Sequence, residues 1–267
     1  MLTMEETVCD TYARDGVVKI ENALSKDWLA QAESLFEWSI AHPGPGAATL
    51  FGGTEGAFRH DLCNPNAPQA YAEFLEASPV ADLVSGLWGG SPVWFMYEQI
   101  FLKEGVSARR TPWHQDAPYL AVNGAHIAVV WITFEPLSRE ESLEFIRGSH
   151  KGPLFDGSRF DPEDETAPIF GHGLPRLPDI EADRAAHDIV GWAVEPGDVI
   201  VFHPAVLHGG GAAPKGGKRR TLSLRFFGED AWYAERPGPA GPRVAGVHEA
   251  LAPGMRFRHP AFLSLRP

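Results

Sequence analysis

The sequence predicts a mainly β protein with flanking helices. Glycine and proline, which favour turns, occur 28 and 23 times among 267 residues. From Ser91 onward, short runs of β-branched and aromatic residues alternate with segments that contain Gly and Pro. Eight tryptophans and 16 phenylalanines supply bulky side chains for an interior. Short strands separated by such turns are typical of a sandwich, a jelly roll or a barrel.

Two helical stretches are predicted before the first strand. Apolar residues recur at helical spacing over residues 28–40, and Ser25 can cap this helix. The segment Pro43-Gly44-Pro45-Gly46 ends it, and we expect the helix to pack over a sheet. The second stretch is predicted over residues 68–87, ending at Gly89-Gly90.

Six strands are predicted from the β-like runs. In the first of them, Tyr97, Gln99, Phe101 and Lys103 share one face, because alternate residues of a strand point the same way. The turn Glu195-Pro196-Gly197-Asp198 predicts that the strands on either side of it pair with each other. The predicted strands cover residues 93–103, 126–134, 143–146, 189–194, 199–202 and 221–227.

One domain over residues 1–267 is the simplest organisation, because the sequence shows no internal repeat and no clear boundary. We expect a helical flank over about 1–90 and a β core over about 91–230. Residues 151–188 are rich in Gly, Pro and acidic residues, and so long a loop is unusual in a compact domain. This insertion is interpreted either as a lid over a site or as a solvated loop.

Charge and cysteine content exclude several functional classes. With 23 basic and 35 acidic residues, the net charge of −12 disfavours binding to nucleic acid or to anionic membranes. Two cysteines, Cys9 and Cys63, are too few for a disulfide scaffold or a cysteine-rich metal site, and they fit a reduced compartment. The sequence shows no secretory signal and no membrane span, so we expect a cytoplasmic protein with a small-molecule partner. The oligomeric state is not predicted.

A candidate metal site begins with Pro112-Trp113-His114-Gln115-Asp116. On a strand, His114 and Asp116 would project to the same side and could offer a nitrogen and an oxygen to one metal ion. A buried His–Asp hydrogen bond is the alternative. His208, which is followed by three glycines, would complete the two-His, one-carboxylate triad of non-haem Fe(II) oxygenases. His203 is the competing third ligand.

Cations then enter the last predicted strand, in Lys218-Arg219-Arg220-Thr221. A guanidinium there could bind a carboxylate through two parallel hydrogen bonds, which a lysine cannot do. Neighbouring residues on a strand face opposite ways, so at least one of Arg219 and Arg220 is expected to be a solvated surface charge.

Taken together, these motifs resemble the phytanoyl-CoA dioxygenase-like family of Fe(II)/2-oxoglutarate oxygenases. The resemblance spans roughly residues 10–227. It begins with Asp15-Gly16-Val17-Val18, and three further matches keep the family's order. They are Trp113-His114-Gln115-Asp116, then the segment from Leu143 to Lys151 that contains Gly148-Ser149-His150, and then Pro196-Gly197-Asp198 leading to His208-Gly209.

The resemblance implies a double-stranded β-helix, or cupin-like jelly roll, with flanking helices. It also implies Fe(II) held by His114, Asp116 and His208. The family's arginine for 2-oxoglutarate lies eleven residues beyond the distal histidine, which gives Arg219, with Arg220 as the fallback.

Three further positions follow from the same resemblance. Gln99 and Trp131 match residues that line the co-substrate pocket, and Arg59 is loosely matched to a family cation. His150 is interpreted as structural, because it ends a strand motif.

The activity implied is hydroxylation of an unactivated C–H bond in a small organic molecule. The co-substrates would be 2-oxoglutarate and O2, and the by-products succinate and CO2. A carboxylate at Asp116 favours hydroxylation over halogenation, since halogenating relatives carry a small residue there. Two alternatives are a cupin-like metalloenzyme that does not use 2-oxoglutarate and a non-catalytic jelly-roll binding protein.

Overall fold

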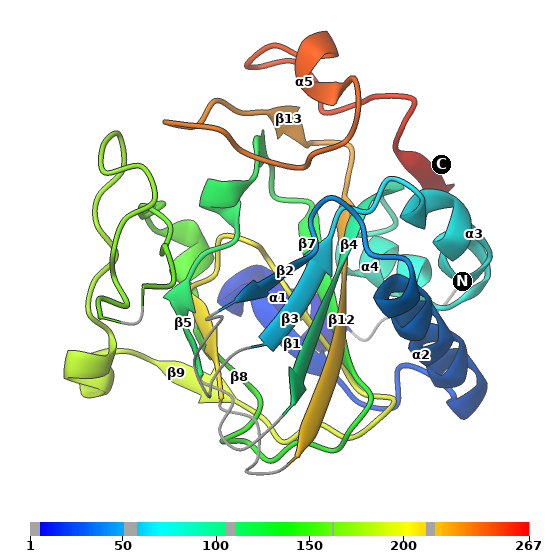
Figure 1. Cartoon of the computed structure of the whole chain (residues 1–267), viewed down its shortest axis with the longest axis horizontal. Helices are drawn as coiled ribbons and strands as arrows, with labels where there is room; N and C mark the ends of the chain where they lie inside the picture. The colour runs from blue at the N-terminus through cyan, green and yellow to red at the C-terminus, as the bar shows by residue number, and fades with distance from the viewer. Residues whose placement is uncertain (1–5, 51–57, 105–109, 162, 212–216, 267) are drawn as a thin grey trace.

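The computed structural model describes residues 6–50, 58–104, 110–161, 163–211 and 217–266. Figure 1 shows how the helices and strands of these residues are arranged. They are α1 (Glu6–Asp15), β1 (Val17–Ile20), α2 (Lys26–Ala41), β2 (Ala48–Leu50), β3 (Phe58–Leu62), α3 (Ala67–Ala77), α4 (Val80–Leu87), β4 (Val93–Glu104), β5 (Thr111–His114), η1 (Ala117–Tyr119), β6 (Val122–Asn123), β7 (Ile127–Thr133), β8 (Leu143–Ile146), η2 (Ser149–Lys151), η3 (Glu181–Ala186), β9 (Ile189–Gly191), β10 (Val199–Phe202), β11 (His208–Gly210), β12 (Lys218–Phe227), β13 (Trp232–Tyr233), α5 (Val247–Ala250) and β14 (Leu263–Arg266).

Two antiparallel sheets form the body of the fold. The larger has the strand order β1-β10-β7-β12-β4-β3-β2, with β14 added beside β4, and the smaller has the order β5-β11-β8-β9. Their facing sides share one apolar cluster, in which Trp131 and Phe202 of the larger sheet meet Phe145 and Val190 of the smaller. The predicted class, a mainly β jelly roll with flanking helices, is confirmed.

The other face of the larger sheet is covered by helices. In Figure 1, α2, α3 and α4 lie on one side of this sheet, while β5, β8 and β9 lie on the other. Phe36 of α2 and Tyr71 of α3 belong to the same buried cluster as Leu222 and Leu224 of β12. Alternation along β12 therefore sends its even-numbered apolar residues toward the helices and its odd-numbered residues toward the smaller sheet.

Ser25 begins α2 as predicted, since its side chain accepts a hydrogen bond from the backbone N–H of Trp28. The single stretch predicted over 68–87 is wrong, because the structure divides it into α3 and α4. Ser78 is extended (φ −72°, ψ 162°) and Pro79 follows it. Proline disfavours the helical conformation in the residue before it and donates no N–H, so the first helix has to end there.

The predicted pairing of residues 189–194 with 199–202 is also wrong. β9 pairs with β8 in the smaller sheet, whereas β10 pairs with β1 and β7 in the larger one. The turn at Glu195-Pro196-Gly197-Asp198 carries the chain from one sheet to the other. Turn chemistry fixes a local change of direction, and it does not decide which strands become neighbours.

The described residues of 151–188 form a long segment beside the smaller sheet, containing the end of η2 and the whole of η3. The segment has an internal anchor, because the Asp156 carboxylate accepts the backbone N–H groups of residues 169, 170 and 171. Leu177 and Ile180 pack against Trp113 and Leu207 in a small buried cluster. Part of this insertion is therefore packed onto the strands that carry the predicted metal ligands.

Within the described part of the chain, none of the helices combines the length and apolar character that crossing a bilayer requires.

Candidate metal centre and adjoining cavity

His114 and His208 are brought together by strand pairing. They are direct partners across the antiparallel β5–β11 pair, and their ring centroids lie 4.2 Å apart. The pairing register shifts between His208 and Gly210. Both histidines are buried, with 8% and 4% of their surface exposed. Two imidazoles that are 94 positions apart in the sequence thus lie next to each other between the two sheets.

A backbone carbonyl fixes the tautomer of each imidazole. His114 Nδ1 lies 2.8 Å from the carbonyl oxygen of Pro112, and His208 Nδ1 lies 3.0 Å from that of Val206. A carbonyl oxygen only accepts, so Nδ1 carries the proton in each ring and donates it. Nε2 of each ring is left with its lone pair directed at the other groups of the site, as a metal ligand requires.

Asp116 joins the two histidines, although by a different local structure from the one predicted. β5 ends at His114, and Asp116 lies beyond it in αR conformation (φ −74°, ψ −29°), directly before the short helix η1. A bend at Asp116, not the alternation of a strand, therefore turns the carboxylate toward the imidazoles. Gln115 is held by contacts with the backbone of Ala205 and Phe155.

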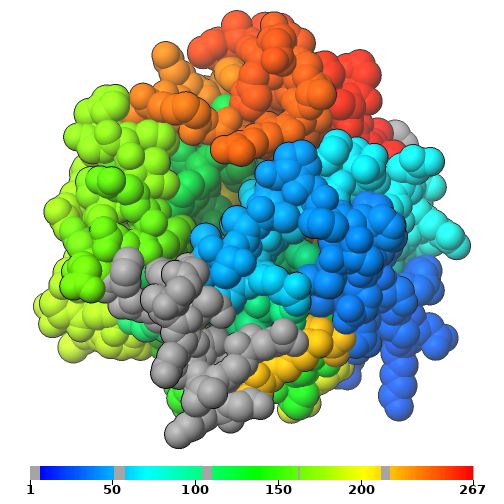
Figure 2. Space-filling view, viewed as in Figure 1, coloured from blue at the N-terminus to red at the C-terminus, as the bar shows by residue number. Residues whose placement is uncertain are grey.

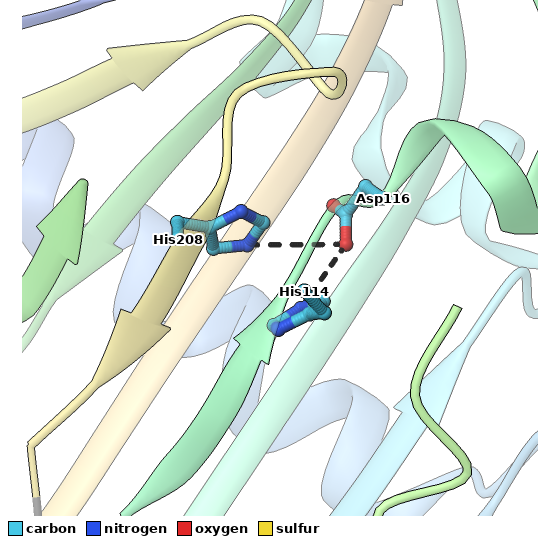
Figure 3. A group of neighbouring side chains, drawn as sticks. All are labelled: His114, Asp116 and His208. Atoms are coloured by element: carbon cyan, nitrogen blue, oxygen red, sulfur yellow. Dashed lines mark ion pairs between the residues drawn. The ribbon is translucent and has the colours of Figure 1, made fainter. Parts of the chain in front are cut away.

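The three side chains converge on a common point, as Figure 3 shows. Asp116 Oδ1 lies 3.5 Å from His114 Nε2 and 3.9 Å from His208 Nε2. One ligand atom from each residue lies within 4.8 Å of the others. Such separations bracket one cation with bonds of about 2 Å to nitrogen and oxygen. Two imidazoles and a carboxylate on one face form the donor set typical of non-haem Fe(II).

Electrostatics keep Asp116 and His208 in their metal-binding protonation states. Burial alone would raise the pKa of Asp116, but the Arg225 guanidinium and the imidazoles of His114 and His208 hold it far below its ordinary value. Burial, followed by the proximity of His114, lowers the pKa of His208 to about 3. The carboxylate is therefore ionised and the His208 imidazole neutral at pH 7, so neither has to lose a proton when a cation binds.

Arg225 is a member of the site that sequence reasoning missed. Its Nη2 donates to Asp116 Oδ2 at 2.7 Å, and its guanidinium lies over the Tyr97 ring, 4.8 Å from the centroid. A signal for it was present in the sequence, because Arg225 is six residues after Arg219 and so shares its face of β12.

The triad opens into a cavity of about 310 Å³ between the sheets. The space-filling view in Figure 2 shows the surface hollowed between the insertion and the β2–β3 hairpin, and Leu50, Phe58 and Phe160 from these two segments line the cavity. By area, the wall of this cavity is mostly apolar. A mainly apolar cavity with a few convergent polar groups is typical of a small-molecule site.

Gln99 and Trp131 both line this cavity. They lie on either side of Ser223, which pairs with Gln99 of β4 and with Trp131 of β7. The three residues form one row across three neighbouring strands. The structure thus brings both predicted lining residues to the same cavity as the triad.

Arg219 lines the cavity and Arg220 does not. Arg219 is 4% exposed, its guanidinium lies 5.9 Å from the Trp131 ring centroid, and its Nη1 donates to the backbone carbonyls of Glu141 and Gly211. Burial lowers its pKa to about 10, so it is charged at pH 7.

Lys103 is a second buried basic residue beside Arg219. It is the cross-strand partner of Arg219, is 1% exposed, and its Nζ donates to Thr111 Oγ1 at 3.1 Å. Burial, followed by the charge of Arg219, holds the pKa of Lys103 well below its ordinary value. The sequence placed Lys103 on the face of Gln99, but not beside Arg219.

Three other histidine and arginine candidates lie elsewhere. His203 Nε2 contacts the carbonyl oxygen of Gly124, and its ring lies 5.7 Å from that of His150, away from the triad. The His150 ring packs closely against Gly16 and takes no part in the triad. Arg59 is exposed and lines a separate pocket behind β3, since on that strand His60 points into the main cavity. Arg59, which was loosely matched to a family cation, therefore does not line the cavity of the triad.

A family model described as phytanoyl-CoA dioxygenase (PhyH) matches residues 12–221, most of the chain and all three triad residues. The chain belongs to the phytanoyl-CoA dioxygenase family. Members of this family are non-haem oxygenases that depend on Fe(II) and 2-oxoglutarate. The family match and the His–Asp–His group together confirm the predicted enzyme class and its two cofactors.

Curated relatives agree with this assignment. The chain is 30% identical over 142 residues to the peroxisomal phytanoyl-CoA dioxygenase of Homo sapiens, an alignment that covers 52% of this chain and 40% of that protein. It is 28% identical over 174 residues to a probable phytanoyl-CoA dioxygenase of Caenorhabditis elegans, covering 59% of this chain and 51% of that protein. The chain thus spans about half or less of the length of the curated relatives it matches.

Solved structures share the fold over nearly the whole chain. The α-ketoglutarate-dependent carbocyclase SnoK from nogalamycin biosynthesis aligns with a TM-score of 0.72 at 19% identity, covering 98% of this chain and 96% of that one. The epimerase SnoN, in complex with Fe3+, α-ketoglutarate and nogalamycin RO, aligns with a TM-score of 0.73 at 20% identity, covering 98% of both chains. EctD from S. alaskensis aligns with a TM-score of 0.68 at 17% identity, covering 95% of this chain and 89% of that one.

Proposed function

We propose that this protein is a dioxygenase that hydroxylates an unactivated C–H bond of a small organic molecule. One substrate molecule, one 2-oxoglutarate and one O2 would give the hydroxylated product, succinate and CO2. The observation that supports this proposal is the convergence of His114, Asp116 and His208 at the wall of a cavity that also contains a buried arginine, Arg219.

The ligand atoms follow from the hydrogen bonds of the site. His114 and His208 would each offer Nε2, because Nδ1 of each ring donates to a backbone carbonyl. Asp116 would offer Oδ1, since Oδ2 is already bonded to Arg225. When bound, iron and 2-oxoglutarate supply the oxidising chemistry, and the protein supplies fixed ligands, orientation and a shielded cavity.

Arg219 is the proposed anchor for the far carboxylate of 2-oxoglutarate. A guanidinium buried between two sheets is well suited to a carboxylate, because low exposure strengthens a charge-assisted hydrogen bond. Its two backbone acceptors, Glu141 and Gly211, fix its orientation before any anion arrives. Gln99 and Trp131 would line the co-substrate's part of the cavity.

The substrate would occupy the apolar part of the same cavity. Tyr119 and Phe160 each direct a ring toward His114, with centroid separations of 6.4 and 5.3 Å and steep interplanar angles. Both line the cavity, as do Leu62 and Phe101. A cavity of about 310 Å³ with such walls favours a compact molecule that has an apolar body.

An anaerobic titration with Fe(II) and 2-oxoglutarate tests the proposal. A visible charge-transfer band should appear only when both are present, and a substrate screen should then look for the spectral shift that follows displacement of water. Once a substrate has been identified, turnover with isotopically labelled O2 should place one labelled oxygen atom in the product and one in succinate. O2-dependent succinate formation would exclude both a metalloenzyme that does not use 2-oxoglutarate and a non-catalytic binding protein.

Labelled O2 also distinguishes hydroxylation from other outcomes of the same machinery. SnoN is described as an epimerase and SnoK as a carbocyclase, and both share this fold. A product without the label, formed together with succinate, would replace hydroxylation by a reaction of that kind.

The cytoplasmic location stays part of the proposal. Cys9 and Cys63 are free thiols, which fits a reducing compartment. The human relative is named as a peroxisomal protein, so fractionation of cells that express this chain would decide between the two compartments.

A further inference from the structure

The two oxygens of the Asp116 carboxylate have different partners. Oδ1 faces the imidazoles, 3.5 Å from His114 Nε2 and 3.9 Å from His208 Nε2. Oδ2 accepts a hydrogen bond from Arg225 Nη2 at 2.7 Å. The carboxylate is therefore already divided between a metal-facing oxygen and a guanidinium-facing oxygen. The second contact selects Oδ1 as the ligand atom, but the proposed function gives Arg225 itself no role.

This arginine contact is unusual, because it uses only one side of the guanidinium. An arginine that meets a carboxylate head-on commonly donates to both oxygens through two parallel bonds. Here Arg225 Nε and Nη1 are buried and have no hydrogen-bond partner among the described residues, while Nη2 alone reaches Asp116. A two-bond fork would have taken Oδ1 as well, and Oδ1 would then no longer be available to a metal.

The position of Arg225 explains the one-sided contact. Its guanidinium lies 4.8 Å from the centroid of the Tyr97 ring, and Tyr97 is its cross-strand partner on β4. The pairing of β12 with β4 becomes irregular directly after this residue. With 5% of Arg225 exposed, neither solvent nor a change of rotamer offers the guanidinium an easy alternative.

We propose that Arg225 is a positioning residue that keeps Asp116 a one-oxygen ligand of the iron centre. The proposal rests on the function proposed above. An octahedral ion held by two imidazoles and one carboxylate oxygen keeps three open positions. A carboxylate that binds through both oxygens would leave two, which 2-oxoglutarate alone would fill. Arg225 thus preserves the position that O2 needs.

Binding of nitric oxide, a stable stand-in for O2, tests the proposal without turnover. The variant is Arg225→Gln, and the matched control is Arg220→Gln, the same change on the same strand but on the opposite face. For each protein, the affinity for Fe(II), the affinity for 2-oxoglutarate and the affinity of the ternary complex for nitric oxide are measured anaerobically, the last by electron paramagnetic resonance.

The expected result is a separation of these three affinities. Arg225→Gln should bind Fe(II) within about threefold of the unmutated protein and should still bind 2-oxoglutarate, while its affinity for nitric oxide falls at least tenfold. Arg225→Lys, which can still donate to Oδ2, should recover part of that affinity. Unchanged nitric oxide binding in Arg225→Gln would overturn the proposal, as would a loss of Fe(II) binding by a folded Arg225→Gln protein.

A measurement on the unmutated protein keeps the proposal testable if Arg225→Gln does not fold. In a crystal structure of the Co(II)-loaded protein, the metal should be bonded to Asp116 Oδ1 while Oδ2 remains on Arg225. Both oxygens bonded to the metal would overturn the proposal. If the charge-transfer band did not appear in the unmutated protein with Fe(II) and 2-oxoglutarate, the proposed dioxygenase function would be contradicted instead. The failure of the Arg225 proposal and the failure of the proposed function are therefore distinguishable.

Discussion

Arg219 and Arg220 follow one another on β12, but their guanidinium groups lie on opposite faces of the larger sheet. Arg219 is buried in the cavity between the sheets. Arg220 reaches the helical side, where it forms ion pairs with Glu33 and Glu37 of α2 and with Glu135, at distances of 2.6, 3.0 and 2.6 Å. One of the two arginines is thus available to a ligand, and the other ties a helix to the sheet.

Replacing each arginine should therefore have a different effect. Arg219→Gln should weaken 2-oxoglutarate binding to the Fe(II)-loaded protein at least tenfold, and Arg219→Lys several fold, because lysine keeps the charge but loses the fork. Arg220→Gln should leave 2-oxoglutarate binding unchanged and lower the free energy of unfolding by about 1 to 3 kcal/mol, because three ion pairs are lost. Calorimetric titration and urea unfolding measure the two effects. Equal 2-oxoglutarate affinity in Arg219→Gln and the unmutated protein would move the anchor elsewhere.

Asp116→Ala should abolish product formation and weaken Fe(II) binding by two orders of magnitude or more. The substitution removes the anionic ligand, and it also leaves the buried Arg225 without its carboxylate partner. Breaking a buried ion pair by removing one partner costs about 3 to 5 kcal/mol, so the metal-free variant should also be less stable. Anaerobic metal titration and urea unfolding give both values. Full turnover by this variant without chloride would contradict the assignment of Asp116 as a ligand.

Sequence patterns predicted those parts of the fold and site that depend on local chemistry. The capped helix at Ser25 was predicted from capping and periodicity, and the cavity-facing row on β4 that includes Gln99 from alternation. His114 and Asp116 were predicted together, but for the wrong local reason, since the strand ends at His114 and a bend at Asp116 brings them to one side.

What the sequence did not predict depends on packing between distant segments. The placement of β9 and β10 in different sheets depends on which strands become neighbours, and a turn signal does not contain this information. The hydrogen bond of Arg225 to Asp116 joins residues 109 positions apart. In the sequence of a strand, nothing distinguishes an arginine that will be buried from one that will be solvated. Only the three-dimensional register of β12 against β4 distinguishes them.

Glu98 should make the stability of the protein depend on pH. It is 2% exposed, its Oε1 accepts the backbone N–H of Asn64, and burial raises its pKa from 4.5 to about 7. Between these two values the folded state holds a proton that the unfolded chain has released. The free energy of unfolding should therefore fall as the pH rises from about 4.5 to about 7, by about 3 kcal/mol from this residue.

Glu98→Gln should remove this contribution, because its side chain stays neutral while its oxygen can still accept from Asn64. The variant should be more stable than the unmutated protein at pH 8, and the difference should shrink toward pH 4.5. Glu73→Gln, at an exposed position of α3, is the matched control and should follow the unmutated protein at each pH. Parallel stability profiles for Glu98→Gln and the unmutated protein, measured by urea unfolding, would show that Glu98 is ionised in the folded state.

Glu181 should hold the insertion over residues 151–188 against the strand that carries His114. Its Oε1 accepts the indole N–H of Trp113 at 2.6 Å and pairs with Arg110 and Arg184 at 2.6 and 2.8 Å. Trp113 directly precedes His114, and Phe160 of the insertion directs its ring at His114. Loosening this attachment should therefore expose the insertion and disturb the substrate's side of the cavity.

Glu181→Ala should raise the rate of tryptic cleavage at Arg159 and Arg176, two exposed arginines of the insertion, at least several fold. Metal and 2-oxoglutarate affinities should stay within a few fold, because neither proposed binding group contacts Glu181, whereas kcat/KM for the substrate should fall. Glu163→Ala, an exposed acidic position of the same insertion, is the control and should change none of these values. If the cleavage rate of Glu181→Ala equals that of the control, the internal packing at Asp156 and Ile180 suffices to hold the insertion, and Glu181 contributes only a surface ion pair.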